Sequence, residues 1–226
     1  MRGISLQNLP HRAIVAVTYT APWNRWSTDL SLYYVGESGS PFTYRAWGEN
    51  RRGDLNADGS NINDPIYVPR SALDTTEIRF SGISDSLGAD TSATAQADHV
   101  RKQQNAFQRF IQETACLRRQ RGRILERHSC REPWTHTMIA ALRQRVPLGD
   151  RALEVELDAF NVLNMLSSRW GLYRIAEPRL LEHVRQTPGS SQTSQPIFRF
   201  NAARPKRTVL QPESTFQLQL AIRYRF

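Results

Sequence analysis

The amino-acid sequence predicts an all-β, antiparallel fold, in which long strands cross a membrane as part of a β-barrel. Three observations predict this fold class. Five long segments alternate between apolar and polar residues, short and long connections alternate between the segments, and aromatic residues gather near the segment ends. A soluble antiparallel sandwich with one face in water alternates in the same way, so this second architecture stays open.

The alternating segments have the length of strands that span a bilayer. In the fourth segment, Leu153 and Leu157 share one face of a strand, and Glu154 and Glu156 share the other. In the fifth segment the alternation continues to the final residue, Phe226. Transmembrane strands need about 9–11 residues, and the predicted strands lie near residues 12–20, 29–44, 134–146, 151–162 and 215–226.

The connections between these segments are uneven. APWNRWST and PLGD make two short joins, whereas residues 45–133 and 163–214 make two long loops. Loops of this length are uncommon in compact soluble domains, but outer-membrane barrels combine short periplasmic turns with long extracellular loops. With the C-terminus placed in the periplasm, both short joins fall on the periplasmic side. We expect one short helical segment at 97–114 and one extra strand at 197–200 inside the loops.

Aromatic residues lie where the interfacial girdles of a barrel are expected. Such girdles flank the apolar band on both sides of the membrane. The residues near segment ends that we assign to them are Trp23, Trp26, Tyr44, Trp134, Phe160, Tyr224 and Phe226.

The composition and charge narrow the class of protein but do not identify its partner. The chain has 226 residues, a formal net charge of +9 and 39% hydrophobic residues, and its mean hydropathy is −0.54. No run approaches the roughly 18 apolar residues of a transmembrane helix, and the opening MRGISLQNLPHR lacks the apolar stretch of a signal peptide. We therefore expect either a cytosolic protein or a fragment whose export signal lies upstream. The basic charge suits a solvated surface, nucleic acid, anionic lipid or an anionic ligand.

Several stretches resemble one family when they are taken together and in order. They are SLYYVGESGSPFTYR, RRGDLNADGSNINDPIYVPR, CLRRQRGRILERHSCREPW, LDAFNVLNMLSSRWG and the final strand that ends in Phe. Over residues 14–226 the chain resembles the C-terminal barrel of TonB-dependent outer-membrane receptors. The resemblance is to the Oar-like group in particular, whose members carry a carboxypeptidase-regulatory-like N-terminal domain.

The resemblance implies that residues 1–226 are a partial receptor barrel in the outer membrane of a Gram-negative type of cell. A plug domain, a TonB box and a signal peptide are absent from the sequence. Five strands are fewer than the roughly eight of the smallest barrels. We therefore expect a fragment of a receptor or transporter for an unknown ligand, which contributes barrel wall, extracellular loops and an assembly signal.

The same resemblance implies the partners. They are outer-membrane lipid and lipopolysaccharide, the barrel-assembly machinery, and TonB only through N-terminal parts that this sequence lacks; no nucleic acid is expected. The assembly signal is assigned to Tyr224 and Phe226, which the machinery would read by adding a strand at an exposed edge.

The stretch DLNADGSNIND has oxygen ligands at the spacing of a calcium loop. Alternate acidic and amide residues turn to one side, and Gly59 suits the sharp turn. It is not an EF-hand, because Pro65 stands where the bidentate Glu belongs. An Asx-rich turn that binds nothing is the alternative. The candidate calcium ligands, the only cofactor we consider, are Asp54, Asn56, Asp58, the Ser60 carbonyl and Asp64.

Two cysteines bracket a basic stretch in the first long loop. Cys116 and Cys130 either form a disulfide in an oxidising compartment or remain free thiols. A disulfide here closes a loop of about 15 residues and contributes roughly 3 kcal/mol. The arginines beside them are a candidate anion patch, and a solvated loop is the alternative: Arg118, Arg119, Arg121, Arg123, Arg127 and Arg131.

The acidic residues predict no catalysis. Glu154, Glu156 and Asp158 line one strand face, where a lumen wall opposite Arg223 and Arg225 is the better interpretation than acid–base chemistry. Since no nucleophile or metal motif appears either, we expect no enzyme. Two competing hypotheses stay open: a soluble basic β-rich module that binds nucleic acid or polysaccharide through segment 117–131, and an adhesin-like barrel without transport.

Overall fold

The computed structural model describes residues 5, 7–23, 26–83, 91–190, 194–203 and 207–226. The chain is 44% strand and 18% helix, mostly in antiparallel sheets, which confirms the all-β class. It divides into two compact units, which we describe separately. The sheet unit comprises Leu9–Ser40, Glu132–Ile175 and Thr208–Phe226, and the core unit comprises Met1–Asn8, Pro41–Arg131 and Ala176–Arg207.

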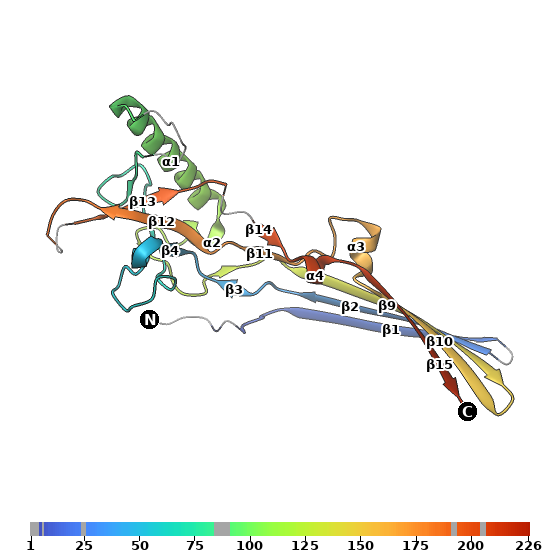
Figure 1. Cartoon of the computed structure of the whole chain (residues 1–226). Helices are drawn as coiled ribbons and strands as arrows, with labels where there is room; N and C mark the ends of the chain where they lie inside the picture. Colours follow the sequence, from blue (N-terminus) through green and yellow to red (C-terminus); the bar gives the residue numbers. More distant parts are fainter. Residues whose placement is uncertain (1–4, 6, 24–25, 84–90, 191–193, 204–206) are drawn as a thin grey trace. The chain divides into compact units, whose positions relative to one another are not determined.

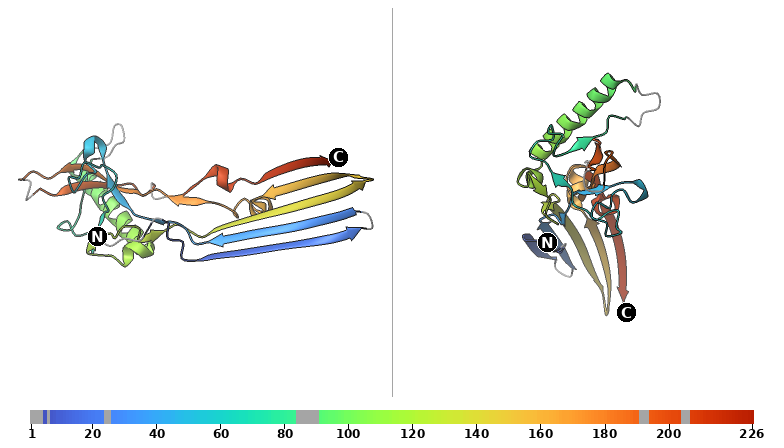
Figure 2. Two further views of the ribbon diagram at one scale, coloured as in Figure 1. Left: turned by 90° about the horizontal axis from the view of Figure 1, so that it is seen from below. Right: turned by 90° about the vertical axis from the view of Figure 1, so that its left-hand side faces the viewer.

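The sheet unit is built on one antiparallel sheet of five strands, side by side in the order β1-β2-β9-β10-β15 (Figures 1 and 2). Each strand overlaps one of the five predicted segments. The strands are β1 (Arg12–Trp23), β2 (Trp26–Glu37), β9 (Thr135–Leu148), β10 (Arg151–Phe160) and β15 (Gln217–Arg225).

The pairing register shows that the two ends of this sheet carry different connections. Trp23 pairs with Trp26 and Leu148 with Arg151, so both short connections lie at one end. The C-terminus lies there too, because Arg225 pairs with Ala152, the second residue of β10. The long connections leave from the opposite end. We call these the turn end and the loop end.

The predicted strand 29–44 and the predicted eight-residue join before it are wrong. β1 continues through Trp23 and β2 begins at Trp26. Pro22 is tolerated within β1 because β1 is an edge strand and needs no N–H donor on its open side. β2 ends at Glu37, since Gly39 lies so close to the Glu132 backbone that no Cβ fits.

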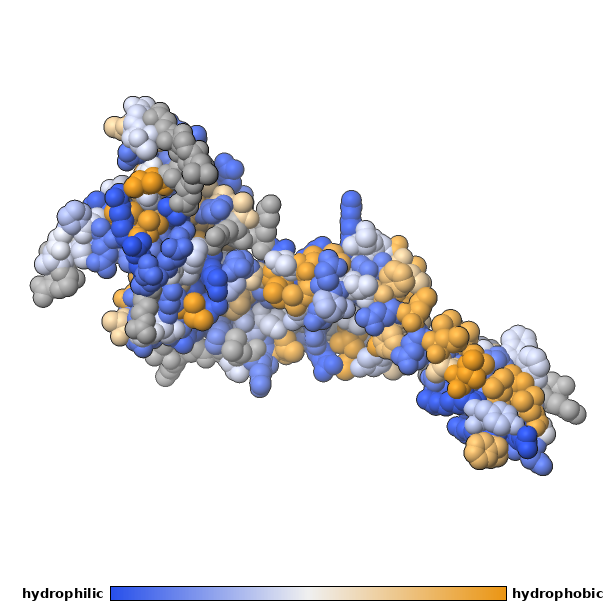
Figure 3. Space-filling view, in the orientation of Figure 1, coloured by the Kyte–Doolittle hydropathy of each residue, from blue (hydrophilic) through white to orange (hydrophobic). Residues whose placement is uncertain are grey.

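The two faces of the sheet differ in polarity across all five strands. One row of paired residues runs Tyr19, Leu30, Leu142, Leu157 and Leu220, and each of these side chains is 40–65% exposed. Apolar residues gather over this part of the molecule in Figure 3. The neighbouring row on the opposite face runs Thr20, Asp29, Arg143, Glu156 and Ala221.

The core unit has its own hydrophobic interior. A four-stranded sheet of β4 (Arg45–Trp47), β12 (Arg179–Gln186), β13 (Pro196–Phe200) and β6 (Arg79–Phe80) packs with helix α1 (Ala93–Glu113). The Ser92 hydroxyl accepts a hydrogen bond from the Ala95 N–H and caps this helix. Phe107 is fully buried and contacts the rings of Phe80 and Phe200.

The helical content is larger than the sequence predicted. The expected helical segment at 97–114 is confirmed, but α1 begins four residues earlier, at Ala93, and spans 21 residues. Its first turn, ATAQ, contains no large apolar residue, so hydrophobic spacing gave no sign of it. The other short elements among the described residues are β3 (Pro41–Phe42), η1 (Glu49–Arg51), β5 (Tyr67–Val68), α2 (Ala115–Arg118), β7 (Arg123–Ile124), β8 (Cys130–Arg131), α3 (Val162–Leu166), β11 (Arg174–Ala176), β14 (Arg207–Val209) and α4 (Gln211–Ser214).

Two of the aromatic residues assigned to interfacial girdles have other positions. Tyr44 is buried in the core unit, where its ring meets Phe42 and Phe110 edge-on. Phe160 lies on the polar face by register, because it shares the parity of Glu154 and Glu156. No helix in the described ranges is long and apolar enough to cross a membrane.

Candidate functional site

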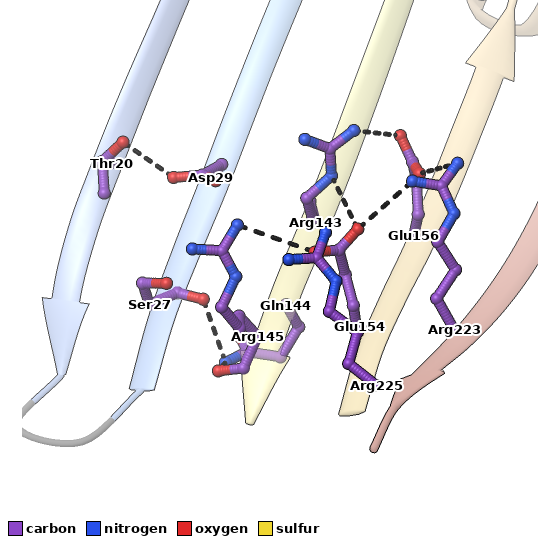
Figure 4. Close-up of polar contacts among 10 residues, drawn as sticks. All are labelled: Thr20, Ser27, Asp29, Arg143, Gln144, Arg145, Glu154, Glu156, Arg223 and Arg225. Carbon is purple, nitrogen blue, oxygen red and sulfur yellow. Dashed lines mark hydrogen bonds and ion pairs between the residues drawn. The ribbon is translucent and has the colours of Figure 1, made fainter. Parts of the chain in front are cut away.

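A cluster of ion pairs lies on the polar face near the turn end (Figure 4). Glu154 on β10 is only 3% exposed. Its carboxylate lies 3.5–3.8 Å from guanidinium nitrogens on both neighbouring strands, β9 and β15. These four nitrogens belong to Arg143, Arg145, Arg223 and Arg225.

Glu156 extends the cluster by one row. Its carboxylate receives a hydrogen bond of 2.7 Å from Arg143 and lies 3.7 Å from Arg223. Four guanidinium groups thus surround two carboxylates, an excess of two positive charges (4 − 2). The arginines keep 40–67% of their side chains exposed, so the cluster presents positive charge to whatever fills the space beside this face.

The sequence predicted half of this cluster. The expected juxtaposition of Glu154 and Glu156 with Arg223 and Arg225 is observed as ion pairs, and a lumen on this side of the sheet stays a prediction. Asp158 has no ion pair in the described part of the chain. The arginines of β9 were missed, although Arg143 and Arg145 alternate with Leu142 and were visible as the polar face of the third segment.

The predicted assembly residues, Tyr224 and Phe226, lie at the turn end of the sheet. Tyr224 lies on the apolar face, and its hydroxyl accepts a hydrogen bond of 3.0 Å from the Arg151 guanidinium. Phe226 is fully exposed, with its ring centre 6.5 Å from that of Tyr224. β15 is an edge of the sheet, so its outer side is open to a further strand.

In the candidate calcium loop, the carboxylates bind the main chain of the same loop. Asp54 accepts hydrogen bonds from the N–H groups of Asp58 and Gly59 at 3.0 and 2.9 Å. The carboxylate of Asp64 is buried and accepts from Leu55 and Asn56 at 2.6 and 3.2 Å.

Asp58 is held differently from the other acids of this loop. The Asn63 side-chain amide and the Ser60 N–H hold the pKa of the Asp58 carboxyl below its ordinary value. The Asn56 carbonyl oxygen accepts from the Asp58 N–H at 2.9 Å. No group of three or more His, Cys, Asp or Glu that could hold a metal ion is found among the described residues. The geometry is that of linked Asx turns, and calcium stays a prediction.

The six arginines of the candidate anion patch do not form one surface. Arg121 donates to the Arg70 carbonyl at 2.7 Å, and Arg118 donates to the Gln112 carbonyl at 2.7 Å. Arg131 donates to the Asn8 carbonyl at 2.9 Å. Arg123 pairs with Glu126, Arg119 and Arg131 line one pocket of about 820 Å³, and Arg127 lines another of about 230 Å³.

Cys116 and Cys130 form a disulfide in the core unit, with their Cα atoms 5.2 Å apart. Both residues are buried and belong to the hydrophobic core. Cys116 lies in α2, and Cys130 lies in β8, where it pairs with Phe42. The bridge therefore ties the arginine-rich segment to the core at both of its ends.

Comparisons with known proteins add no family. No protein-family model matches the chain, and searches of the curated proteins and of the solved structures find no significant match.

Replacing Glu154 with Ala is expected to lower the free energy of unfolding by roughly 1–3 kcal/mol, because four guanidinium groups lose their common carboxylate. The measurement is chemical unfolding of the whole chain in detergent micelles, followed by far-UV circular dichroism. Asp150→Ala, in the exposed turn between β9 and β10, is the control. Equal unfolding midpoints for both variants would show that the cluster is not stabilising.

Replacing both Cys116 and Cys130 with Ser is expected to destabilise the core unit by about 3 kcal/mol, since the cross-link is lost from a loop of about 15 residues. Hydrogen–deuterium exchange of the α2 and β8 amides measures the effect. A reductant should bring the wild-type chain to the exchange rates of the variant and leave the variant unchanged. Slow exchange in the fully reduced wild type would contradict this prediction.

Replacing Asp64 with Ala is expected to speed amide exchange in residues 53–64 by about tenfold or more, because two N–H groups lose their buried acceptor. Glu126→Ala, an exposed residue of the same unit, serves as control. Repeating the wild-type measurement with about 1 mM calcium chloride tests the ion, since extracellular calcium modules bind at about 10⁻⁴–10⁻³ M. Exchange rates that calcium leaves unchanged would rule against the calcium site.

Proposed function

We propose that this chain forms part of the wall of an outer-membrane β-barrel, in a receptor of the TonB-dependent kind. The observation that carries the proposal is the apolar face of the sheet unit, which is exposed across all five strands. The opposite face carries the charged cluster around Glu154. A sheet with one continuous apolar face and one charged face suits a wall between lipid and a water-filled lumen.

Water is a poor solvent for the apolar face. Leu218, Leu220 and Ile222 alone are 59–65% exposed on one strand, and the rows that they belong to continue through β10, β9, β2 and β1. Soluble monomers rarely expose contiguous apolar patches beyond a few hundred Å². Acyl chains would solvate these side chains without that cost.

On the apolar face, aromatic rings near the turn end and near the loop end are separated by a height that fits a bilayer. At the turn end, Trp23 pairs with Trp26 on the apolar face. Near the loop end, His136 pairs with Gly36, which pairs in turn with Ala13. Trp23 follows Ala13 by ten positions (23 − 13) on β1, which is about 33 Å along a strand. A strand tilted by about 40° reduces this to roughly 25 Å, the height of the apolar band of an outer-membrane barrel.

The edges of the sheet require further strands. Within the described residues, β1 and β15 pair on one side only. In lipid, each unpaired backbone N–H or C=O costs several kcal/mol, so a membrane sheet must close on itself. Since about eight strands make the smallest closed barrels, the proposed barrel contains strands in addition to these five.

The end of β15 supports the assembly role. Tyr224 and Phe226 lie at the end of an edge strand, and neither ring is buried. An exposed edge with an aromatic end can be recognised by strand addition, where main-chain hydrogen bonds give affinity and the aromatic side chains give specificity. We assign to this strand the signal for barrel assembly.

The test of the proposal inserts the same charge on the two faces of one strand. Leu220→Arg places a guanidinium on the apolar face, and Gln219→Arg places one on the polar face. The chain is mixed with vesicles of outer-membrane lipids, and the fraction that floats with them is measured. Leu220→Arg is expected to lose about 2–4 kcal/mol of membrane stability, whereas Gln219→Arg is expected to float like the wild type.

Equal flotation of the two variants would contradict the assignment of the faces. A wild-type chain that stays monodisperse without detergent and does not float would overturn the membrane proposal. Salt-sensitive binding of nucleic acid by such a chain would instead favour the soluble basic module.

A further inference from the structure

We propose that the loop end of the sheet unit binds the phosphate group of an anionic lipid, in a pocket on the apolar face. This inference rests on the proposed function, since it needs the apolar face to lie in lipid. The pocket has a volume of about 210 Å³. We call it the Trp134–Trp170 pocket; its lining includes Trp134, His136, Leu163, Arg169, Trp170 and Arg174.

The register places one wall of the pocket on the lipid-facing side. His136 pairs with Gly36 and shares the parity of Met138, which pairs with Tyr34, so both belong to the apolar face. The Tyr34 hydroxyl and His136 Nδ1 form a hydrogen bond of 2.8 Å. Their rings stack in a row with Trp134 and His11, with ring centres 6.2–6.3 Å apart. Rings with polar tips are typical of the zone where lipid head groups meet acyl chains.

The other wall is a loop held in one conformation by two asparagines. Asn161 is buried in a left-handed conformation, and its side-chain amide donates to the Gly171 carbonyl at 2.9 Å. Asn164 donates to the Trp170 carbonyl at 3.1 Å. A Cβ at position 171 would lie 2.0 Å from the Asn161 side-chain oxygen, so only glycine fits there. This scaffold follows β10 and includes α3 (Figure 1). The hydrogen bond from Asn164 fixes the backbone at Trp170.

The charge of the pocket points to an anion. Arg169 and Arg174 are both exposed, and no carboxylate lines the pocket. In the described part of the chain, neither guanidinium has an ion pair or a hydrogen bond. Guanidinium groups bind phosphate with two parallel hydrogen bonds and are weakly hydrated, which suits a site at the edge of lipid.

The size and position of the pocket favour a lipid over a free anion. Pockets that enclose a whole small ligand measure about 300–1,000 Å³, so this smaller pocket takes one phosphate group, and the rest of the lipid lies outside it. The acyl chains of that lipid would continue along Met138 and Leu142, in the direction of the turn end. We therefore commit to a phosphorylated lipid of the outer leaflet, such as the glycolipid anchor of lipopolysaccharide.

The experiment measures lipid binding by the whole chain in detergent micelles, with native mass spectrometry. The probes are a diphosphorylated glucosamine-disaccharide lipid, its dephosphorylated counterpart with the same chains, and inorganic phosphate. Arg169→Gln with Arg174→Gln is expected to weaken binding of the phosphorylated lipid by about tenfold or more. Arg118→Gln with Arg119→Gln, in the core unit, should leave it unchanged.

The wild-type chain should bind the dephosphorylated lipid as weakly as the Arg169 and Arg174 variant binds the phosphorylated one. Equal binding of both lipids by the wild type, no binding, or loss of binding only in the Arg118 and Arg119 variant would overturn the pocket assignment. If inorganic phosphate at millimolar concentrations displaces the phosphorylated lipid, the pocket is a site for free anions instead. If the chain floats with vesicles and the Leu220 variant does not, any of these results leaves the membrane proposal intact and removes only the lipid site.

Discussion

The register of five antiparallel strands decides which solvent every side chain of the sheet unit meets. Because side chains alternate with a period of two, the pairing places all members of one row on the same face of the sheet from β1 to β15. A slip of one residue in β9 would move Arg143 to the apolar face and Leu142 to the charged cluster. The ion pairs of Glu154 exist only in the observed register, and they lose their geometry in the shifted one.

The charged cluster also explains why a nearly buried carboxylate is tolerated on an otherwise open face. A desolvated Glu costs several kcal/mol unless partners replace water. Glu154 sits on the central strand of the three that carry the cluster, and arginines reach it from both sides. Those long side chains cover the carboxylate with their aliphatic stems and keep their charged ends in water.

The strands of the sheet unit and the face on which each residue lies could be predicted from the sequence, because alternation records the face directly. The core unit could not, because its packing joins residues far apart in the chain. Tyr44 continues the alternation of β2, yet its ring packs edge-on against Phe110 of α1 and against Phe42. The start of α1 was missed because its first turn, ATAQ, contains no large apolar residue. Hydrogen bonds such as those from Asn161 and Asn164 to the main chain leave no periodic signal at all.

The formal charge of +9 shows why composition alone could not locate a functional surface. Arginines serve three different purposes in this structure. Arg121 and Arg131 donate to backbone carbonyls within the core unit, so the densest basic stretch of the sequence is partly structural. Arg143 and its neighbours bind two glutamates on the polar face. Arg169 and Arg174 have no such partners among the described residues and lie beside aromatic rings at the loop end. An exposed guanidinium next to apolar surface keeps its full attraction for an anion, because neither a carboxylate nor a carbonyl has already satisfied it. The arginines with the fewest internal contacts, rather than the most crowded in sequence, are therefore those on which an anionic partner should depend.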